Sequence, residues 1–350
     1  MEQKIYNEYV EILKEELLPA MGCTEPIAVA YAAAVAVQAL GEKPESVEVN
    51  VSANIIKNVK SVVVPCTGGL RGIGAAVCAG IVAGCPEKEL EILEEITGEQ
   101  KVEMKKMLDT MPMTIRESDK EYIFDIQIKA CAGGHSGYVE IAGFHTNVIC
   151  VKKDDEIIRE KAYEEQGSSC ATDRSLLTVE KIIEFADCVD VADVEEVLQR
   201  QIDYNWAIAE EGMTGNWGAA IGKTLMEAYG NSVHNRAKAM AAAGSDARMN
   251  GCELPVVINS GSGNQGMTTS LPVIVYAKEL NVSKEMMLRA LVVSNLITIH
   301  MKTGIGRLSA YCGAISAGCG AGAGICYLYG GRAYEISHVI VNAVAINSGV

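Results

Sequence analysis

Cys23 stands in the segment Met21-Gly22-Cys23-Thr24-Glu25-Pro26, between two segments whose apolar residues recur at helical spacing. These segments cover residues 5–18 and 27–40, and the second consists almost entirely of Ala, Val and Leu. Thr24 is a suitable N-cap for the second helix. A thiol at a helix start faces unpaired backbone N–H groups and the positive end of the helix dipole, which favour the thiolate. Cys23 is therefore a candidate base, nucleophile or metal ligand, and a small buried thiol is the alternative.

The loop Asn259–Gly266, with the sequence NSGSGNQG, is rich in small hydrogen-bonding groups. It contains the pattern GxGxxG, but the residues after it resemble a helix rather than the strand and acidic residue of a dinucleotide-binding motif. It is also similar to the asparagine loop of pyridoxal-phosphate enzymes, yet neither Lys57 nor Lys60 lies in a convincing Schiff-base motif. The loop can bind a substrate carboxylate through its hydroxyl, amide and backbone groups. A capped helix junction is the alternative interpretation.

Three side chains that can carry positive charge, His300, Lys302 and Arg307, lie within eight residues. In an acidic protein they form a candidate anion pocket, and a solvated helix end explains them nearly as well. The cysteines that follow, Cys312, Cys319 and Cys326, are spaced by seven residues. Two helical turns separate successive members by about 10.5 Å, which is too far for all three to hold one small cluster. We expect one ligand among them and two small core residues.

Composition and charge favour an acidic globular enzyme. Hydrophobic residues make up 49% of the 350 residues, and the net charge of −15 without a basic run argues against nucleic acid or an anionic membrane as partner. The N-terminus is polar and acidic, which predicts no secretory signal. The uncharged stretch 308–331 is dominated by small residues, so we expect a close-packed buried helix pair rather than a membrane span. Twelve cysteines without a CxxC pair indicate a reducing cytoplasm.

Periodicity predicts an α+β fold in which a mostly helical catalytic domain, residues 1–42 plus 165–350, carries a smaller α+β domain, residues 43–164, inserted after its N-terminal helices. In the inserted domain the expected strands are 46–52, 61–65, 121–130, 137–143 and 147–152, and the expected helices lie within 74–84 and 87–108. Residues 154–169 are polar and are expected to link the domains. The helices expected in the rest of the chain are 176–186, 191–212, 219–229, 233–243, 283–300 and 308–329.

Together, the segments Met21–Pro26, Asn259–Gly266 and His300–Gly313 resemble the iron–sulfur L-cysteine desulfidase family. That family is related to the α-chain or α-domain of the iron–sulfur-dependent L-serine dehydratases. The desulfidase-type resemblance spans essentially all 350 residues, whereas the dehydratase resemblance covers mainly the helical part, where Ser245–Gly251 also has a counterpart.

The resemblance implies a [4Fe–4S] cluster held by three cysteines, with one iron open to substrate. Cys312 matches the first ligand. The other two belong, in the family, to a Cys-Asp-Gly-x-x-x-x-Cys segment expected shortly after Val350, where this sequence ends. We therefore expect this chain to lack two cluster ligands at its C-terminus, and the cluster to be a property of the complete protein.

The resemblance further implies α,β-elimination of L-cysteine to sulfide, ammonia and pyruvate, with the cluster as Lewis acid and Cys23 as the base. The residues expected to bind the small L-amino-acid substrate are Thr24, Glu25, Asn259, Ser260, Ser262, Asn264, His300, Lys302 and Arg307. Two alternatives stay open, an iron–sulfur L-serine dehydratase and a cluster-free, non-catalytic amino-acid-binding fragment. We expect a cytoplasmic homo-oligomer.

Overall fold

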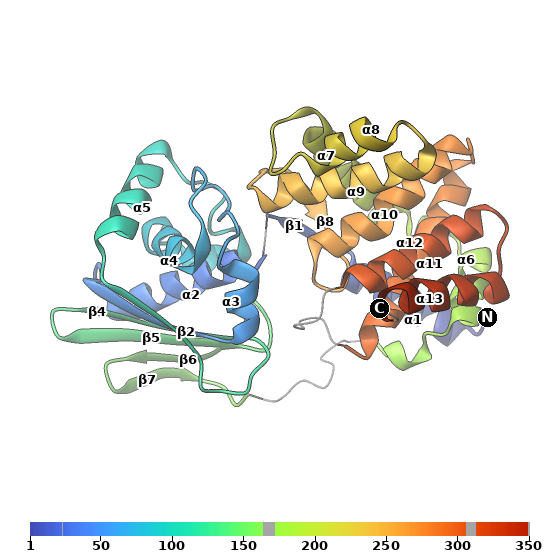
Figure 1. Cartoon of the computed structure of the whole chain (residues 1–350). Helices are drawn as coiled ribbons and strands as arrows, with labels where there is room; N and C mark the ends of the chain where they lie inside the picture. The colour runs from blue at the N-terminus through green and yellow to red at the C-terminus, as the bar shows by residue number, and fades with distance from the viewer. Residues whose placement is uncertain (23, 164–171, 306–312, 349–350) are drawn as a thin grey trace. The chain divides into compact units, whose positions relative to one another are not determined.

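The computed structural model describes residues 1–22, 24–163, 172–305 and 313–348 (Figure 1). The chain forms two compact units. The helical unit comprises residues 1–21, 170–248 and 254–350, and the mixed unit comprises residues 22–169 and 249–253. Each unit is described by itself below.

A six-stranded sheet forms the frame of the mixed unit. Its strand order is β3-β2-β4-β5-β6-β7, with β2 and β3 parallel and all other neighbours antiparallel. The strands are β2 (Ser46–Val51), β3 (Met113–Glu117), β4 (Asp125–Ala132), β5 (His135–Ala142), β6 (Val148–Lys153) and β7 (Glu156–Glu160). The turn between β4 and β5 consists of Gly133 and Gly134, both at positive φ, which suits a tight two-residue hairpin.

The helix α2 (Thr24–Leu40) packs against β4 and β5 and is buried along most of its length. Its small side chains permit close approach: a β-carbon built on Gly137 would lie 2.1 Å from the Ala36 carbonyl oxygen, and one on Gly80 would lie 1.9 Å from that of Ala30. The second contact brings α4 (Gly72–Ala83) onto α2. The core of the mixed unit is therefore built around α2.

This packing differs from the predicted domain boundary, which placed residues 1–42 in the helical domain. Only residues up to Met21 belong to the helical unit, because the all-apolar surface of α2 is buried by the sheet and by α4. The predicted linker 154–169 also differs, since β7 lies within it and pairs with β6. The polar character of β7 reflects its position at the sheet edge, where all five of its residues are exposed.

Other elements of the mixed unit are α3 (Ala53–Val59), the 3-10 helix η1 (Pro86–Glu91) and α5 (Gly98–Thr110). The predicted strand at 61–65 does not form. Val63 makes only an isolated bridge with Arg71, because the chain turns at Cys66, Gly68 and Gly69, which all have positive φ.

The helical unit contains a two-stranded antiparallel pair and a bundle of helices. The pair joins β1 (Pro19–Met21) to β8 (Pro255–Val257), so it ties the segment before Cys23 to the segment before the loop at 259–266. The remaining elements are α1 (Gln3–Glu16), η2 (Arg174–Leu176), α6 (Val179–Cys188), η3 (Val191–Asp193), α7 (Glu195–Thr214), α8 (Ile221–Tyr229), α9 (Val233–Met249), α10 (Gly263–Glu279), α11 (Lys284–Thr303), α12 (Ala314–Leu328) and α13 (Ala333–Ser348). The α+β fold class is thus confirmed.

The helices α11 and α12 pack antiparallel at very short range. A β-carbon on Gly320 would lie 2.4 Å from the Ser294 carbonyl oxygen, and one on Gly324 would lie 2.9 Å from that of Ala290. Gly320 and Gly324 are four residues apart and therefore lie on one face of α12, where they form a stripe without side chains. The predicted helix pair at 308–331 is instead one helix, α12, followed by a turn and α13, and residues 306–312 lie outside the described residues. Across the described chain, no helix is both long enough and apolar enough to cross a membrane.

The glycine stripe makes a stability prediction. Gly320→Ala should lower the free energy of unfolding by about 1–3 kcal/mol, because the new methyl group overlaps Ser294 and Thr298 across the helix contact. Gly318→Ala is the matched control on the same helix. A β-carbon there meets nothing within 4 Å, so we expect a gain of about 0.5–1 kcal/mol. Equal urea midpoints for the two variants would contradict the close packing.

Candidate functional site

Three helices of the helical unit bring their ends together beside the predicted substrate loop. A β-carbon on Gly313 would lie 2.0 Å from Gln265 Oε1, and one on Gly324 would lie 2.8 Å from Val273, so α12 and α10 run parallel and begin side by side. Since α11 is antiparallel to α12, its last turn, with Lys302, lies at this same end. Gly313 directly follows Cys312 in the chain. The packing therefore brings the neighbour of the predicted cluster ligand to the predicted substrate loop.

A chain of buried amides holds the start of this loop. Asn295 on α11 exchanges two hydrogen bonds with Gln201 on α7, at 3.0 and 2.8 Å, and its Oδ1 accepts from Asn259 Nδ2 at 2.9 Å. Asn259 Oδ1 in turn accepts from Ser260 Oγ at 2.9 Å. Asn259 and Asn295 are 0% exposed, and Ser260, 2% exposed, has a φ of 49°. These two loop residues thus shape the loop from inside, and their direct contact with substrate stays a prediction.

The second half of the loop starts α10. Ser262 is the N-cap, and its Oγ accepts from the backbone N–H of Gln265. Asn264 Oδ1 accepts from Arg248 Nη1 at 3.0 Å, and a β-carbon on Gly263 would lie 2.5 Å from Arg248 Nε. The Arg248 guanidinium therefore lies over the first turn of α10. Ser262 and Asn264 are partly exposed, so they are the predicted loop residues best placed to meet a ligand.

His300 and Lys302, the two predicted cations that the structure describes, lie on different sides of α11. Lys302 follows Thr298 by one helical turn and therefore lies on the α10-facing side of α11, where Thr298 Oγ1 is 3.0 Å from Thr269 Oγ1. It is 5% exposed. His300 lies on the α6-facing side of α11, eleven residues after Arg289, whose Nη1 donates to the Ala186 carbonyl oxygen of α6. Burial lowers the pKa of His300, and the charge of Glu180 on α6 opposes this shift. His300 and Lys302 therefore do not line one anion pocket, as had been predicted for them together with Arg307. Arg307 and Cys312 lie outside the described residues.

Cys23 also lies outside the described residues. Its neighbours in the chain, Gly22, Thr24 and Glu25, are described. Gly22 has a φ of 64°, and a β-carbon on it would lie 2.3 Å from Pro65, so only glycine fits. Thr24 is the first residue of α2 rather than its predicted N-cap. Its Oγ1 donates to Glu25 Oε2 at 3.2 Å, and Glu25 Oε1 accepts from Asn58 Nδ2 at 3.3 Å. The two predicted substrate residues thus form one polar cluster at the start of α2.

A second cysteine of the mixed unit, Cys66, follows the proline that packs on Gly22. Its backbone has a φ of 60° and its side chain is half-buried. Burial, together with the nearby Glu253 carboxylate, raises the pKa of the Cys66 thiol to about 11. Cys66 is therefore protonated at neutral pH and is a poor base or nucleophile.

The thiols that the structure describes do not fit an iron–sulfur cluster. Cys319 is fully buried, with its Sγ 3.9 Å from the Ile340 carbonyl oxygen, and burial raises the pKa of its thiol. Cys326, two helical turns after Cys319 on α12, packs against Gly331. Within the described ranges no three His, Cys, Asp or Glu side chains are grouped to hold a metal ion. Cys319 is thus a core residue, and Cys326 is partly buried beside the core.

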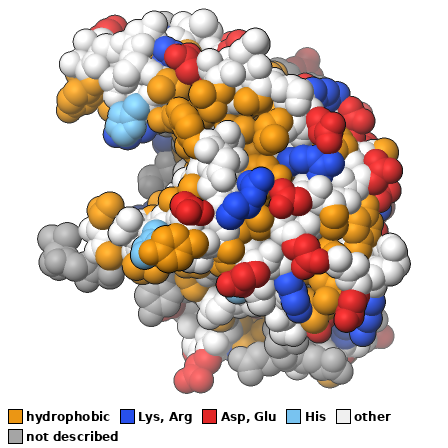
Figure 2. Space-filling model, turned by 90° about the vertical axis from the view of Figure 1, so that its right-hand side faces the viewer, with side chains coloured by type: hydrophobic (Ala, Val, Ile, Leu, Met, Phe, Trp, Pro, Cys, Tyr) orange, Lys and Arg blue, Asp and Glu red, His pale blue; other side chains and the backbone are white. Residues whose placement is uncertain are grey.

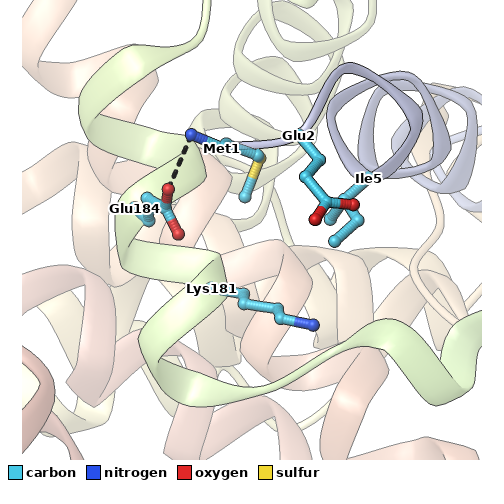
Figure 3. A pocket seen from close by; sticks show the side chains of 5 residues that line it. All are labelled: Met1, Glu2, Ile5, Lys181 and Glu184. Atoms are coloured by element: carbon cyan, nitrogen blue, oxygen red, sulfur yellow. Dashed lines mark ion pairs between the residues drawn. The ribbon is translucent and has the colours of Figure 1, made fainter.

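A pocket elsewhere in the helical unit contains none of the predicted residues. It lies between α1 and α6, where the Met1 amino group forms an ion pair with Glu184 at 2.7 Å (Figure 3). Its remaining lining comes from Glu2, Ile5 and Lys181. On the face of the molecule shown in Figure 2, acidic and basic side chains are scattered among apolar ones, without a continuous basic area.

Comparison with known proteins places this chain in a family. Residues 87–350 match the family model described as serine dehydratase alpha chain. The chain belongs to the serine dehydratase alpha chain family. This confirms the predicted relation to the dehydratases, and the match extends beyond the helical part into the mixed unit.

Several relatives align with nearly the whole of this chain. The chain is 57% identical to a UPF0597 protein of Desulfitobacterium hafniense, over 100% of this chain and 81% of that protein. It is 50% identical to a UPF0597 protein of Lachnoclostridium phytofermentans and 42% identical to one of Treponema denticola. These alignments cover 99% and 100% of this chain, and 83% of each relative.

Sequence reasoning missed four residues of this region: Gln201, Arg248, Gln265 and Asn295. Arg248 lies inside the motif Ser245–Gly251 and Gln265 inside the loop Asn259–Gly266, so these motifs could have indicated them. A polar residue within the apolar run of α11 was the signal for Asn295. Gln201 carries no signal, because its partner is 94 residues away.

The amide chain makes a prediction about the loop. Asn295→Leu should lower the free energy of unfolding by about 1–3 kcal/mol, because it leaves buried groups of Gln201 and Asn259 without partners. Asn342→Leu on the exposed side of α13 is the control and should change stability by less than about 0.5 kcal/mol. Urea unfolding measures both. If Asn295→Leu unfolds at the parent's urea concentration, the amide chain does not hold the loop.

Proposed function

We propose that this chain is a lyase that eliminates the β-substituent of a small L-amino acid, with L-cysteine as its substrate. The reaction consumes L-cysteine and water and yields pyruvate, ammonia and hydrogen sulfide. Membership of the serine dehydratase alpha chain family supports β-elimination from an amino acid. The choice of L-cysteine rests on the motifs around Cys23 and between His300 and Gly313.

One observation of the structure carries the proposal. The first turn of α10, which belongs to the polar loop, lies against Gly313. Gly313 is the residue after Cys312, the proposed cluster ligand. Segments almost fifty residues apart in the sequence, proposed on separate grounds to bind substrate and cofactor, therefore meet at one end of the bundle.

The proposed cofactor is a [4Fe–4S] cluster with Cys312 as one ligand. The described thiols do not supply the other ligands, so the steps assigned here use only groups of the chain itself. The Cys23 thiolate removes the Cα proton. The Cβ–S bond then breaks as sulfide leaves, and the aminoacrylate formed becomes an imine and is hydrolysed to pyruvate and ammonia. Ser262, Asn264 and Lys302 orient the substrate and balance its charge.

L-serine is the second candidate substrate, favoured by the name of the matching family. A hydroxyl leaving group replaces the thiol, and the proton abstraction at Cα is the same. The experiment that tests both is anaerobic reconstitution of the chain with iron and sulfide, followed by removal of the excess. Pyruvate and sulfide released in equal amounts from L-cysteine support the first proposal. Pyruvate from L-serine alone supports the second, and no pyruvate from either identifies this chain as a non-catalytic form.

The role of Cys23 predicts a specific loss. Cys23→Ala should lower turnover by about 10²–10⁴-fold, because a general base contributes that much, while iron content stays at the parent value. Cys66→Ala is the matched control, since the Cys66 thiol, with a pKa of about 11, holds its proton. Turnover of L-cysteine and bound iron are measured on the same samples. Parental turnover in Cys23→Ala would remove Cys23 from the mechanism.

The role of Cys312 predicts a loss of metal. Cys312→Ser should retain less iron than the parent after reconstitution, because a hydroxyl is a weaker ligand for iron than a thiolate. Cys319→Ala should retain the parental amount, since the Cys319 thiol is buried against α13. Iron and acid-labile sulfide report the outcome. Equal iron in both variants would show that Cys312 is not a ligand.

A further inference from the structure

Gln265 carries a buried acceptor without a donor. The residue is 6% exposed, and its Oε1 has no hydrogen-bond partner among the described residues, while its Nε2 donates a long hydrogen bond of 3.5 Å to the Asn259 carbonyl oxygen. Exchanging the two amide atoms would not help, because the oxygen would then face a carbonyl oxygen. A buried acceptor left unsatisfied destabilises the fold, so this oxygen is a candidate partner for a donor on a ligand.

The oxygen lies where two helices begin. It faces Gly313, the N-cap of α12, and it belongs to the first turn of α10. In that turn Ser262 satisfies the backbone N–H groups of Gln265 and Gly266. The N–H groups of Gly263 and Asn264 have no acceptor among the described residues. Two parallel helix N-termini with open N–H groups favour a negative charge.

From this juxtaposition we infer that the heads of α10 and α12 bind a zwitterionic α-amino acid, with Gln265 Oε1 accepting from its α-ammonium group and the open N–H groups of α10 donating to its carboxylate. A carboxylic acid without the amine leaves Oε1 unpaired, and an amine without the carboxylate leaves the N–H groups unpaired. The assignment rests on the proposed function, because it concerns the substrate of the same site. It makes Gln265 the residue that selects amino acids over their deaminated analogues.

The test uses ligands that cannot react. L-alanine has no leaving group on Cβ, and propionate is the same molecule without the amine. The parent chain should bind L-alanine at least about ten-fold more tightly than propionate, measured by isothermal titration calorimetry, because a hydrogen bond to a charged group has that effect. Gln265→Met removes the acceptor and should lower the affinity for L-alanine about ten- to hundred-fold without changing that for propionate. Gln265→Glu keeps an acceptor and should keep the preference.

The control variant changes a glutamine that lies away from the heads of α10 and α12. Gln199→Met, at a partly exposed glutamine of α7 that donates to Asp203, should leave both affinities unchanged. Equal binding of L-alanine and propionate by the parent overturns the inference, as does an unchanged preference in a folded Gln265→Met variant. If Gln265→Met does not fold, loss of the preference in a folded Gln265→Glu overturns it.

Turnover of L-cysteine by the parent, measured separately, distinguishes the two proposals. Binding that depends on Gln265 without turnover leaves the inference standing and contradicts the lyase. Turnover of L-cysteine without a preference for L-alanine over propionate supports the lyase and overturns the inference about Gln265.

Discussion

The buried hydrogen bonds of Asn295 are the interaction on which the arrangement of the helical unit depends. This side chain lies in the middle of α11, is fully buried, and joins α7 to the loop before α10 through Gln201 and Asn259. In an apolar core each amide must find its partner, so only one placement of the loop satisfies all of them. The hydrogen bonds therefore fix the loop more narrowly than hydrophobic packing alone would.

Close helix packing extends that constraint to the proposed cofactor segment. Gly320 and Gly324 allow α12 to lie directly on α11, and α10 packs on α12 in parallel. Because α10 and α12 run parallel and are in contact along their length, the start of α12 lies beside the start of α10. Gly313 then has no room for a side chain next to Gln265. The geometry of the candidate site is thus a consequence of backbone contacts rather than of the site residues themselves.

In the mixed unit, the sequence correctly predicted the helix α2 but not which unit buries it. The apolar segment at 27–40 was correctly predicted as a buried helix, and its observed helix is α2. An all-round apolar helix has no face that indicates its partner, so nothing in the sequence said that a sheet would bury it. The edge strand β7 was missed for the opposite reason, because an exposed strand without alternation looks like a linker.

The sequence by itself determined the α+β fold class, most of the helices, and the motifs that predicted a relation to the serine dehydratase alpha chain family, since periodicity and local motifs are properties of neighbouring residues. The tertiary structure alone decided that α2 belongs to the sheet, that His300 faces α6, and that Gln265 meets Gly313. Each of these depends on contacts between residues far apart in the chain. Such contacts are selected by close packing and by hydrogen-bond satisfaction in the folded core, which no local pattern records.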